Sequence, residues 1–441
     1  MKRLMNRLRR PMGRRGRQAG IALVIVTVTT AVMGAVVGDF AYNSRVDLEA
    51  AANGRDELRA EYLARSGIQL SRLLIKVQQS VLDRNRQFVG DIQISDFAPY
   101  LVKAFGGSAD EAAGIGALIG VDFSQLKGLG VGKSASFDVN MESDDGKLNL
   151  NCGGGLAETA KQAQLFAVLS ALMWPPRYNR MFEMPDSDGQ YFTREDVAKA
   201  IIDWADMDEQ RYDPTGASSG AEDYRYDAQR DPYRAHNHFY DTIEELNLVR
   251  GVGDAFWGSF GDMLTVYGGC KINVGAIKTE HWPLMAAILR ATVKDDHRQD
   301  PVLLDDILLA QLSQTVLGMS KMTGGFQSTQ QFINLISNPA SAFSGGMGGT
   351  GGSSGSSSSS SSGSSSSVVG IPLDPAKLNN VVTVGPRRIY RLDATGTIQR
   401  TMQKKIQIHI RAIWDSAHFN QNSTSGDVND RMGTWVYWRE D

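Results

Sequence analysis

Residues 20–37 read GIALVIVTVTTAVMGAVV and include no charged side chain. An apolar run of about 17 to 20 residues is long enough to cross a bilayer as one helix. The segment before it has eight basic residues and no acidic one: Lys2, Arg3, Arg7, Arg9, Arg10, Arg14, Arg15 and Arg17. Because basic flanks remain on the cytoplasmic side, this pattern predicts a single span with the rest of the chain outside the cytoplasm.

The helical pattern continues beyond the apolar run towards Asp83. Apolar residues recur at helical spacing, at Leu70, Leu73, Leu74, Val77 and Val81. This spacing predicts one stripe that packs on a globular head. With a rise of about 1.5 Å per residue, a helix over residues 21–83 would form a rod of about 90 to 95 Å.

The charge of the chain is unevenly distributed. The 441 residues include 46 basic and 49 acidic side chains, for a formal net charge of -3. Loss of the eight basic residues of the leader would leave a body at -11. An acidic body is repelled by phosphate backbones, so we expect no nucleic-acid partner. A divalent cation is the more natural ligand.

The body combines strand-like and helical patterns. Residues 136–140 and 147–151 alternate about a polar turn at 143–146, which predicts a β-hairpin. Helices are predicted at 157–173 and at 193–204, the second capped by Thr193. Near the end of the chain, strands are predicted at 380–384, 388–392, 398–412 and 434–438, and the first and last parts of the body therefore favour an antiparallel sheet.

These patterns divide the chain into consecutive parts. Residues 1–20 form a leader, 21–85 a transmembrane and amphipathic helix, 86–151 the first part of the head, 152–269 an α-helical domain, 270–344 a second part of the head with a helical module, 345–367 a Gly/Ser linker, and 368–441 the C-terminal strands. The linker composition cannot bury apolar surface.

Acidic residues gather after the second predicted helix. They are Asp203, Asp206, Asp208, Glu222 and Asp223. Carboxylates are hard oxygen ligands of the kind that Ca²⁺ takes at six to eight coordinations, although the spacing is not that of an EF-hand. On composition alone, a solvated acidic loop is the alternative. Acid/base catalysis has no accompanying nucleophile or His pair.

The chain has two cysteines, Cys152 and Cys270. Each lies at the end of a strand-like segment. If those segments are neighbours in an oxidising compartment, a disulfide would close a loop of about 117 residues. Two unpaired cysteines are the alternative.

Gly20 and Ile21 stand where a basic leader meets the apolar helix. This junction resembles the type III signal of pilins and pseudopilins, which prepilin peptidase cleaves after the Gly and whose new N-terminus is methylated. The fifth mature residue would be Ile25, where most of those proteins have an acid. Loss of that acid is typical of the type II secretion system protein K minor pseudopilins.

Further segments match the same family in the same order. They are Asp145-Gly-Lys-Leu-Asn-Leu-Asn151, Ile202-Asp-Trp204, Gly220-Ala-Glu-Asp-Tyr224, Tyr233-Arg-Ala-His-Asn237, Glu244-Glu-Leu246, Ile272-Asn-Val274 and Val436-Tyr-Trp-Arg-Glu440. Together they resemble the type II secretion system protein K family over nearly the whole chain. The Gly/Ser tract departs from the family pattern.

The resemblance implies an α+β, pilin-like fold. A long N-terminal transmembrane helix would pack on an antiparallel sheet, with a large α-helical domain inserted between strands at residues 152–269. Family members are minor pseudopilins at the tip of the secretion pseudopilus, which drives exoproteins through an outer-membrane secretin.

The resemblance also implies partners and a location. The partners would be the minor pseudopilins called I and J, the major pseudopilin, prepilin peptidase and the inner membrane. The head would lie in the periplasm, calcium would bind in the inserted domain through the acidic residues above, and the protein would not be an enzyme. Two other hypotheses are a minor pilin of a type IV pilus and a membrane-anchored periplasmic metal-dependent enzyme.

Overall fold

The computed structural model describes residues 15–79, 93, 134–155, 159–185, 189–216, 220–222, 226, 232–322, 325–339, 369–401, 404–417 and 433–441. The Gly/Ser tract at 345–367, most of the predicted first part of the head, Val81 and Asp223 lie outside these ranges.

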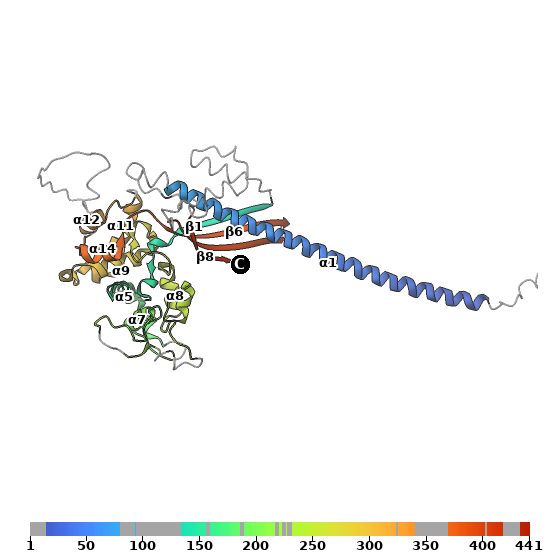
Figure 1. Ribbon diagram of the computed structural model, residues 1–441, viewed down its shortest axis with the longest axis horizontal. Coiled ribbons are helices and arrows are strands. Elements are labelled where there is room, and N and C mark those ends of the chain that lie inside the picture. The colour runs from blue at the N-terminus through green and yellow to red at the C-terminus, as the bar shows by residue number, and fades with distance from the viewer. Residues whose placement is uncertain are drawn as a thin grey trace, which may run out of the picture.

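Helix α1, Arg15–Val77, forms the long rod (Figure 1). Its 63 residues correspond to about 95 Å at 1.5 Å per residue. Residues 20–51 are all exposed in the isolated chain, and the most apolar 18-residue window has a mean hydropathy of 2.4. The helix is therefore long and apolar enough to cross a membrane, as the composition of residues 20–37 predicts.

The C-terminal part of α1 lies on a four-stranded antiparallel sheet. The strands are β1 (Ala135–Ser143), β6 (Ile389–Thr401), β7 (Lys404–Asp415) and β8 (Thr434–Glu440), in the order β1-β6-β7-β8. Met141 of β1 is opposite Leu392 of β6, so strands about 250 residues apart in sequence are neighbours. The predicted strand at 398–412 is wrong as one element, because it covers the end of β6 and most of β7.

The helix and the sheet share one apolar core. It includes Ile68 and Ile75 of α1 and Tyr390 and Trp414 of the sheet. The predicted stripe is wrong in part: Leu73 is 55% exposed and Val77 44% exposed, while Ile68 and Ile75 face the sheet. The face of α1 that packs on the sheet is the one with small residues. The helix approaches β6 so closely that only short side chains fit between the two backbones.

A large helical domain interrupts the sheet between β1 and β6. Its α-helices are α5 (Thr159–Met173), α6 (Asn179–Glu183), α7 (Arg194–Asp203), α8 (Asp254–Phe260), α9 (Trp282–Thr292), α10 (Pro301–Leu304), α11 (Asp306–Met322), α12 (Thr329–Ser337) and α14 (Pro375–Val381). One buried core runs from Leu148 to Val382. The helical unit thus extends beyond the predicted boundary at 269, since α9 packs against both α5 and α11.

Two short parallel pairs lie inside this domain. Strand β2 (Leu148–Asn149) pairs with β3 (Leu264–Thr265), and β4 (Ile272–Asn273) pairs with β5 (Val382–Thr383). The predicted hairpin is therefore wrong. Strand β1 pairs with β6 instead, because the 3-10 turn Asp144–Gly146 redirects the chain out of the sheet and into the helical domain.

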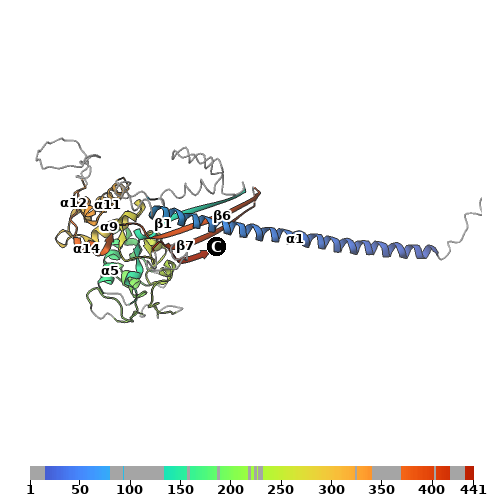
Figure 2. The ribbon, with the colours of Figure 1, turned by 45° about the horizontal axis from the view of Figure 1, so that its top comes forward.

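Both views place the helical domain at the end of α1 that is remote from its apolar half (Figures 1 and 2). The sheet lies between that domain and the exposed part of the rod. The α+β fold predicted from the sequence is confirmed: a long N-terminal helix packs on an antiparallel sheet, and a helical domain is inserted between its strands.

Candidate functional site

Helix α7 delivers the first carboxylate of the predicted acidic site. The helix begins at a capping box in which Thr193 accepts from the backbone N–H of Asp196 and the Asp196 side chain accepts from the backbone N–H of Thr193. The helix ends at Asp203, which is buried. The Asp203 carboxylate accepts a hydrogen bond of 2.6 Å from the backbone N–H of Tyr212, and this fixes its position.

Backbone bridges bring two further carboxylates to Asp203. Asp206 pairs with Gly155 in a parallel bridge, and its Oδ2 accepts a hydrogen bond of 3.1 Å from Gln162 Nε2. Glu222 returns to the same place because an antiparallel bridge joins Gln210 to Ala221. Ligand atoms of Asp203, Asp206 and Glu222 all lie within 4.8 Å of one another, and all three residues are buried.

The surroundings of the cluster disfavour the charged form of two of its carboxylates. Burial raises the pKa of Asp203 to about 7, and burial together with the neighbouring Asp203 raises the pKa of Asp206 to about 8. Two nearby cations are paired with other carboxylates, since Lys199 lies 3.4 Å from Asp213 and Arg211 is paired with Asp196. Arg250 lines the same cavity as Asp203 and Glu222. Carboxylates crowded in this way share a proton or a cation.

The residues fit a hard divalent cation. Asp206 Oδ1 is buried and makes no hydrogen bond to the described residues. A cavity lined by Asp203 and Glu222 has a volume of about 20 Å³, which has room for one ion or one water molecule. Three carboxylates supply part of the six to eight oxygens that Ca²⁺ takes, and backbone carbonyls or water would supply the rest.

Asp208 is not one of the grouped carboxylates. It is exposed, and its Oδ1 accepts a hydrogen bond of 2.7 Å from the backbone N–H of Gln210. Asp223 lies outside the described residues. The structure thus brings together three of the five predicted acidic residues.

Cys152 and Cys270 form a disulfide, with Cα atoms 5.4 Å apart. The two segments meet because β2 and β3 are paired, and β3 lies a few residues before Cys270. The Asn151 side chain donates a hydrogen bond of 2.9 Å to the carbonyl of Val266 and strengthens the contact between the two segments. The bond therefore joins the beginning of the helical domain to the segment that follows α8.

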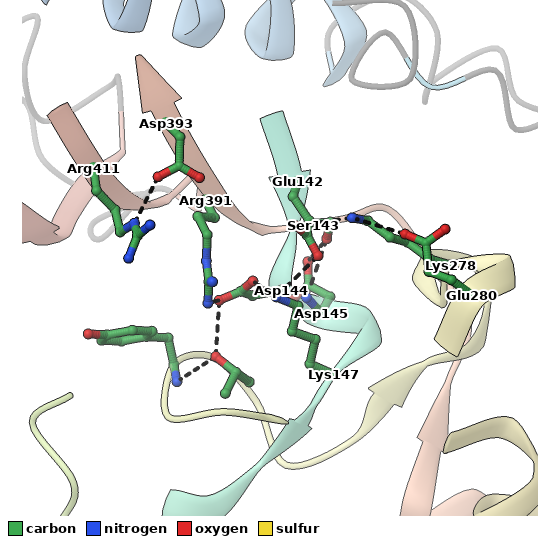
Figure 3. Close-up of polar contacts among 12 residues, drawn as sticks. Glu142, Ser143, Asp144, Asp145, Lys147, Lys278, Glu280, Arg391, Asp393 and Arg411 are labelled. Carbon is green, nitrogen blue, oxygen red and sulfur yellow. Dashed lines mark hydrogen bonds and ion pairs between the residues drawn. The ribbon is translucent and has the colours of Figure 1, made fainter. Parts of the chain in front are cut away.

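A second polar cluster joins the sheet to the helical domain (Figure 3). The Asp144 side chain is fully buried in the turn after β1. Its Oδ2 lies 3.2 Å from Arg391 Nη2 and accepts a hydrogen bond of 3.0 Å from Thr265 Oγ1. Lys147 Nζ lies 3.1 Å from Asp144 Oδ1. Since Arg391 belongs to β6 and Thr265 to β3, this carboxylate holds the two units in a defined orientation.

Neighbouring side chains extend the cluster (Figure 3). Asp145 Oδ2 accepts from the backbone N–H groups of Arg388 at 2.5 Å and Ile389 at 2.9 Å, at the start of β6. Lys278 Nζ lies 3.1 Å from Glu142 Oε2. The sequence analysis missed this cluster because Asp144 and Asp145 are also typical of a hairpin turn. The one signal was the density of charge at residues 142–147, where three acidic residues are followed by Lys147.

The geometry defines a class of protein: a pilin-like protein with a helical domain inserted in its sheet and an N-terminal helix that is long and apolar enough to cross a membrane. Residues 146–269 match the family model described as Type II secretion system (T2SS), protein K. The match covers the first half of the helical domain, including the grouped carboxylates. This part of the chain is therefore similar to protein K of the type II secretion system, and the chain carries it on a pilin-like stem.

One solved structure is also similar. It is the crystal structure of the GspK-GspI-GspJ complex from the enterotoxigenic Escherichia coli type 2 secretion system, at 13% sequence identity and a TM-score of 0.41. The similarity covers 70% of this chain and 80% of that chain. No curated protein matches in the sequence comparison.

Proposed function

We propose that this minor pseudopilin caps the tip of the secretion pseudopilus. The observation that carries the proposal is the position of the inserted domain at the end of α1 remote from its apolar half (Figure 1). Pilin-like subunits stack through parallel, staggered helices, so the next subunit would need the space beside and beyond that end. A helical domain with its own core from Leu148 to Val382 obstructs a copy stacked above it.

The apolar end of α1 supports the same position. Ile25 is 60% exposed on the membrane part of the helix and carries no charge. It therefore cannot pair with the terminal amine of a neighbouring subunit. A subunit without that contact is suited to begin or end a stack.

Gold labelling of pseudopili tests the tip position. Filaments assembled by overproducing the major pseudopilin are labelled with antibodies to an epitope in the helical domain. We expect gold at one end of each filament only. Labelling along the whole length would overturn the proposal.

We also propose that prepilin peptidase cleaves after Gly20 and that Ile21 becomes the methylated N-terminus. The basic leader and the apolar helix that follows support this processing. Intact-mass analysis of protein extracted from membranes should give a chain that starts at Ile21 with one added methyl group. A chain that retains Met1, or one that starts after Gly38, would contradict it.

The partners that we propose are the I-type and J-type minor pseudopilins and the major pseudopilin. The similar crystal structure is of a GspK-GspI-GspJ complex, and residues 146–269 of this chain match the protein K model. Co-purification from membranes with secretion-system subunits, rather than with type IV pilus subunits, distinguishes this proposal from the minor-pilin hypothesis.

We propose that α1 crosses the inner membrane once and that the head lies in the periplasm. The basic leader favours this orientation. The disulfide Cys152–Cys270 supports it, because such bonds persist in the oxidising periplasm. Protease added to spheroplasts should digest the head, and digestion only after lysis would contradict the orientation.

We propose that Asp203, Asp206 and Glu222 hold a calcium ion that stabilises the helical domain. Chelation with EGTA should lower the melting temperature of the purified protein, and added Ca²⁺ should restore it. Asp206→Asn should abolish the shift, whereas the exposed neighbour Asp208→Asn should keep it. If EGTA shifts the melting temperature equally in both variants, calcium does not bind at these three residues.

We further propose that the protein acts without enzymatic activity. The cavity beside the grouped carboxylates is about 20 Å³, far smaller than the few hundred Å³ of a substrate site. This size supports an ion-binding role over the hypothesis of a metal-dependent enzyme. Calcium-dependent turnover of a small substrate by the folded protein would overturn it.

A further inference from the structure

The helical domain contains a larger cavity away from the carboxylate cluster. It has a volume of about 420 Å³ and lies between α5, α9 and α10. Its lining includes Ser170, Trp174, Arg290, Arg298 and Leu304. A volume of a few hundred Å³ is typical of sites that hold a small ligand or a few residues of a peptide.

Two buried polar atoms in this lining have no partner among the described residues. The Arg290 side chain is only 9% exposed, and its Nη1 makes no hydrogen bond. The Ser170 Oγ is also buried without a hydrogen bond. A buried polar group without a partner is destabilising, so a bound acceptor that reaches both atoms would offset this penalty.

The remaining nitrogens of Arg290 hold the guanidinium in place. Nε and Nη2 each donate a hydrogen bond of 3.2 Å to the carbonyl of Leu303. The guanidinium carbon lies 4.5 Å from the centre of the Trp174 ring, which stacks on it. These contacts fix the Arg290 side chain and leave its Nη1 without a hydrogen bond to the described residues.

The charge around the cavity favours an anion. Asp306, the carboxylate nearest to Arg290 at 3.6 Å, lies closer to Arg177, at 3.1 Å. At the mouth, Arg298 shares the carboxylate of Asp295 with Lys377. Each of these two carboxylates serves two cations, and the described residues that line the cavity include Arg290 and Arg298 but no acidic side chain.

Apolar surface accompanies this charge. Trp174 is 42% exposed and Leu304 48% exposed. Large apolar side chains that remain exposed beside a cavity are typical of binding sites. An acidic group next to an apolar side chain would satisfy both halves of the site.

We propose that this cavity binds an acidic peptide segment of a protein partner, with Arg290 and Ser170 contacting a carboxylate and Trp174 and Leu304 contacting a neighbouring apolar side chain. Arg298 strengthens the electrostatic attraction at the mouth. The inference concerns the helical domain alone and does not depend on the tip position or on calcium.

The probe is N-acetyl-leucyl-glutamate, titrated into the purified full-length protein in detergent and followed by tryptophan emission. We expect saturable binding with Kd in the millimolar range, as for small fragments. The C-terminal amide and the glutamine analogue distinguish a terminal carboxylate from a side-chain carboxylate. N-acetyl-leucyl-glutamine amide lacks both carboxylates. If it binds with the same affinity as the probe, or if the probe does not saturate at about 20 mM, the proposal is overturned.

Variants locate the site. Ser170→Ala and Arg298→Gln should each raise Kd about threefold, and Arg290→Gln about tenfold or more. Lys321→Gln, an exposed change in α11, is the matched control and should leave Kd unchanged. If Arg290→Gln lowers the melting temperature sharply, the other two variants decide. Unchanged Kd in both, or displacement of the peptide by inorganic phosphate at equal concentration, would overturn the carboxylate site.

Discussion

The carboxylate of Asp144 lies 3.2 Å from the guanidinium of Arg391, with the Asp144 side chain fully buried between the sheet and the helical domain. This pair connects residues that are 247 positions apart in sequence. It is the point at which the chain leaves the pilin-like sheet, and it holds the orientation on which the tip proposal depends.

Asp144→Asn should destabilise the protein by about 3 to 5 kcal/mol, because Lys147 and Arg391 would lose a buried anion. Denaturant unfolding measures the change. Asp393→Asn is the matched control: its pair with Arg411 spans 2.9 Å between exposed side chains, and the cost should stay below about 1 kcal/mol. Equal costs would mean that burial of the Asp144 pair contributes nothing.

Gly396→Ala should separate α1 from the sheet. A Cβ atom at Gly396 would lie 1.8 Å from the carbonyl oxygen of Ala60, so the backbones must move apart. We expect a loss of at least about 3 kcal/mol in unfolding free energy. Gly385→Ala, where a Cβ atom has open space, should be close to neutral. A stable Gly396→Ala protein would contradict the close helix–sheet contact.

The calcium-free protein should lose stability as the pH rises. The pKa of Asp203 is about 7 and that of Asp206 about 8 in the folded protein, against 3.8 ordinarily. Between about pH 4 and pH 8 the folded state therefore binds more protons than the unfolded state, and the free energy of unfolding falls with increasing pH.

Melting temperatures in EGTA at pH 5 and pH 8 measure this dependence. Asp206→Asn should reduce it, because the substituted side chain no longer ionises and Asp203 alone remains. Asp208→Asn should keep it. Added Ca²⁺ should stabilise the native protein more at pH 8 than at pH 5, because the ion binds the ionised carboxylates. A profile that rises with pH in EGTA would contradict the assigned pKa values.

Loss of the disulfide should destabilise the helical domain. Replacement of Cys152 and Cys270 by Ser opens a covalent loop with a sequence separation of 118 residues, and we expect a cost of about 4 to 5 kcal/mol. Reduction of the native protein should lower its melting temperature as much as the double substitution does. The double variant itself should not respond to the reductant. A reductant response in the double variant would point to another cause.

Local patterns carried much of the fold. The apolar run at 20–37 predicts the membrane helix from composition, and Thr193 predicts the start of α7 from the chemistry of its own hydroxyl. In β7, the period of two places Ile406, Ile408 and Ile410 on one side of the strand, where Ile406 and Ile408 are half-buried and Ile410 is buried. Each of these depends on neighbours a few residues away in the sequence.

Long-range pairing was beyond the reach of those patterns. The turn at Asp144–Gly146 has the composition of a hairpin, yet β1 pairs with β6, because the register is decided by a partner strand that follows the whole helical domain. The face of α1 that packs on the sheet was mispredicted for the same reason. Because α1 approaches Gly396 closely, the face that contacts the sheet is the one with the small residues Ala60 and Ala64, and the larger Leu73 lies on the exposed side.

The sequence by itself determined the long apolar helix, the acidic composition of the site and the identity of the cysteines, since these depend on residue type and local spacing. Only the tertiary structure decided which carboxylates meet. Asp208 is nearer in sequence to Asp203 than Glu222 is, but the bridge between Gln210 and Ala221 returns Glu222 to the cluster and leaves Asp208 in solvent. The cavity beside Trp174 likewise exists only because α5 and α9 pack together, which brings Ser170 and Arg290 into the lining of one cavity.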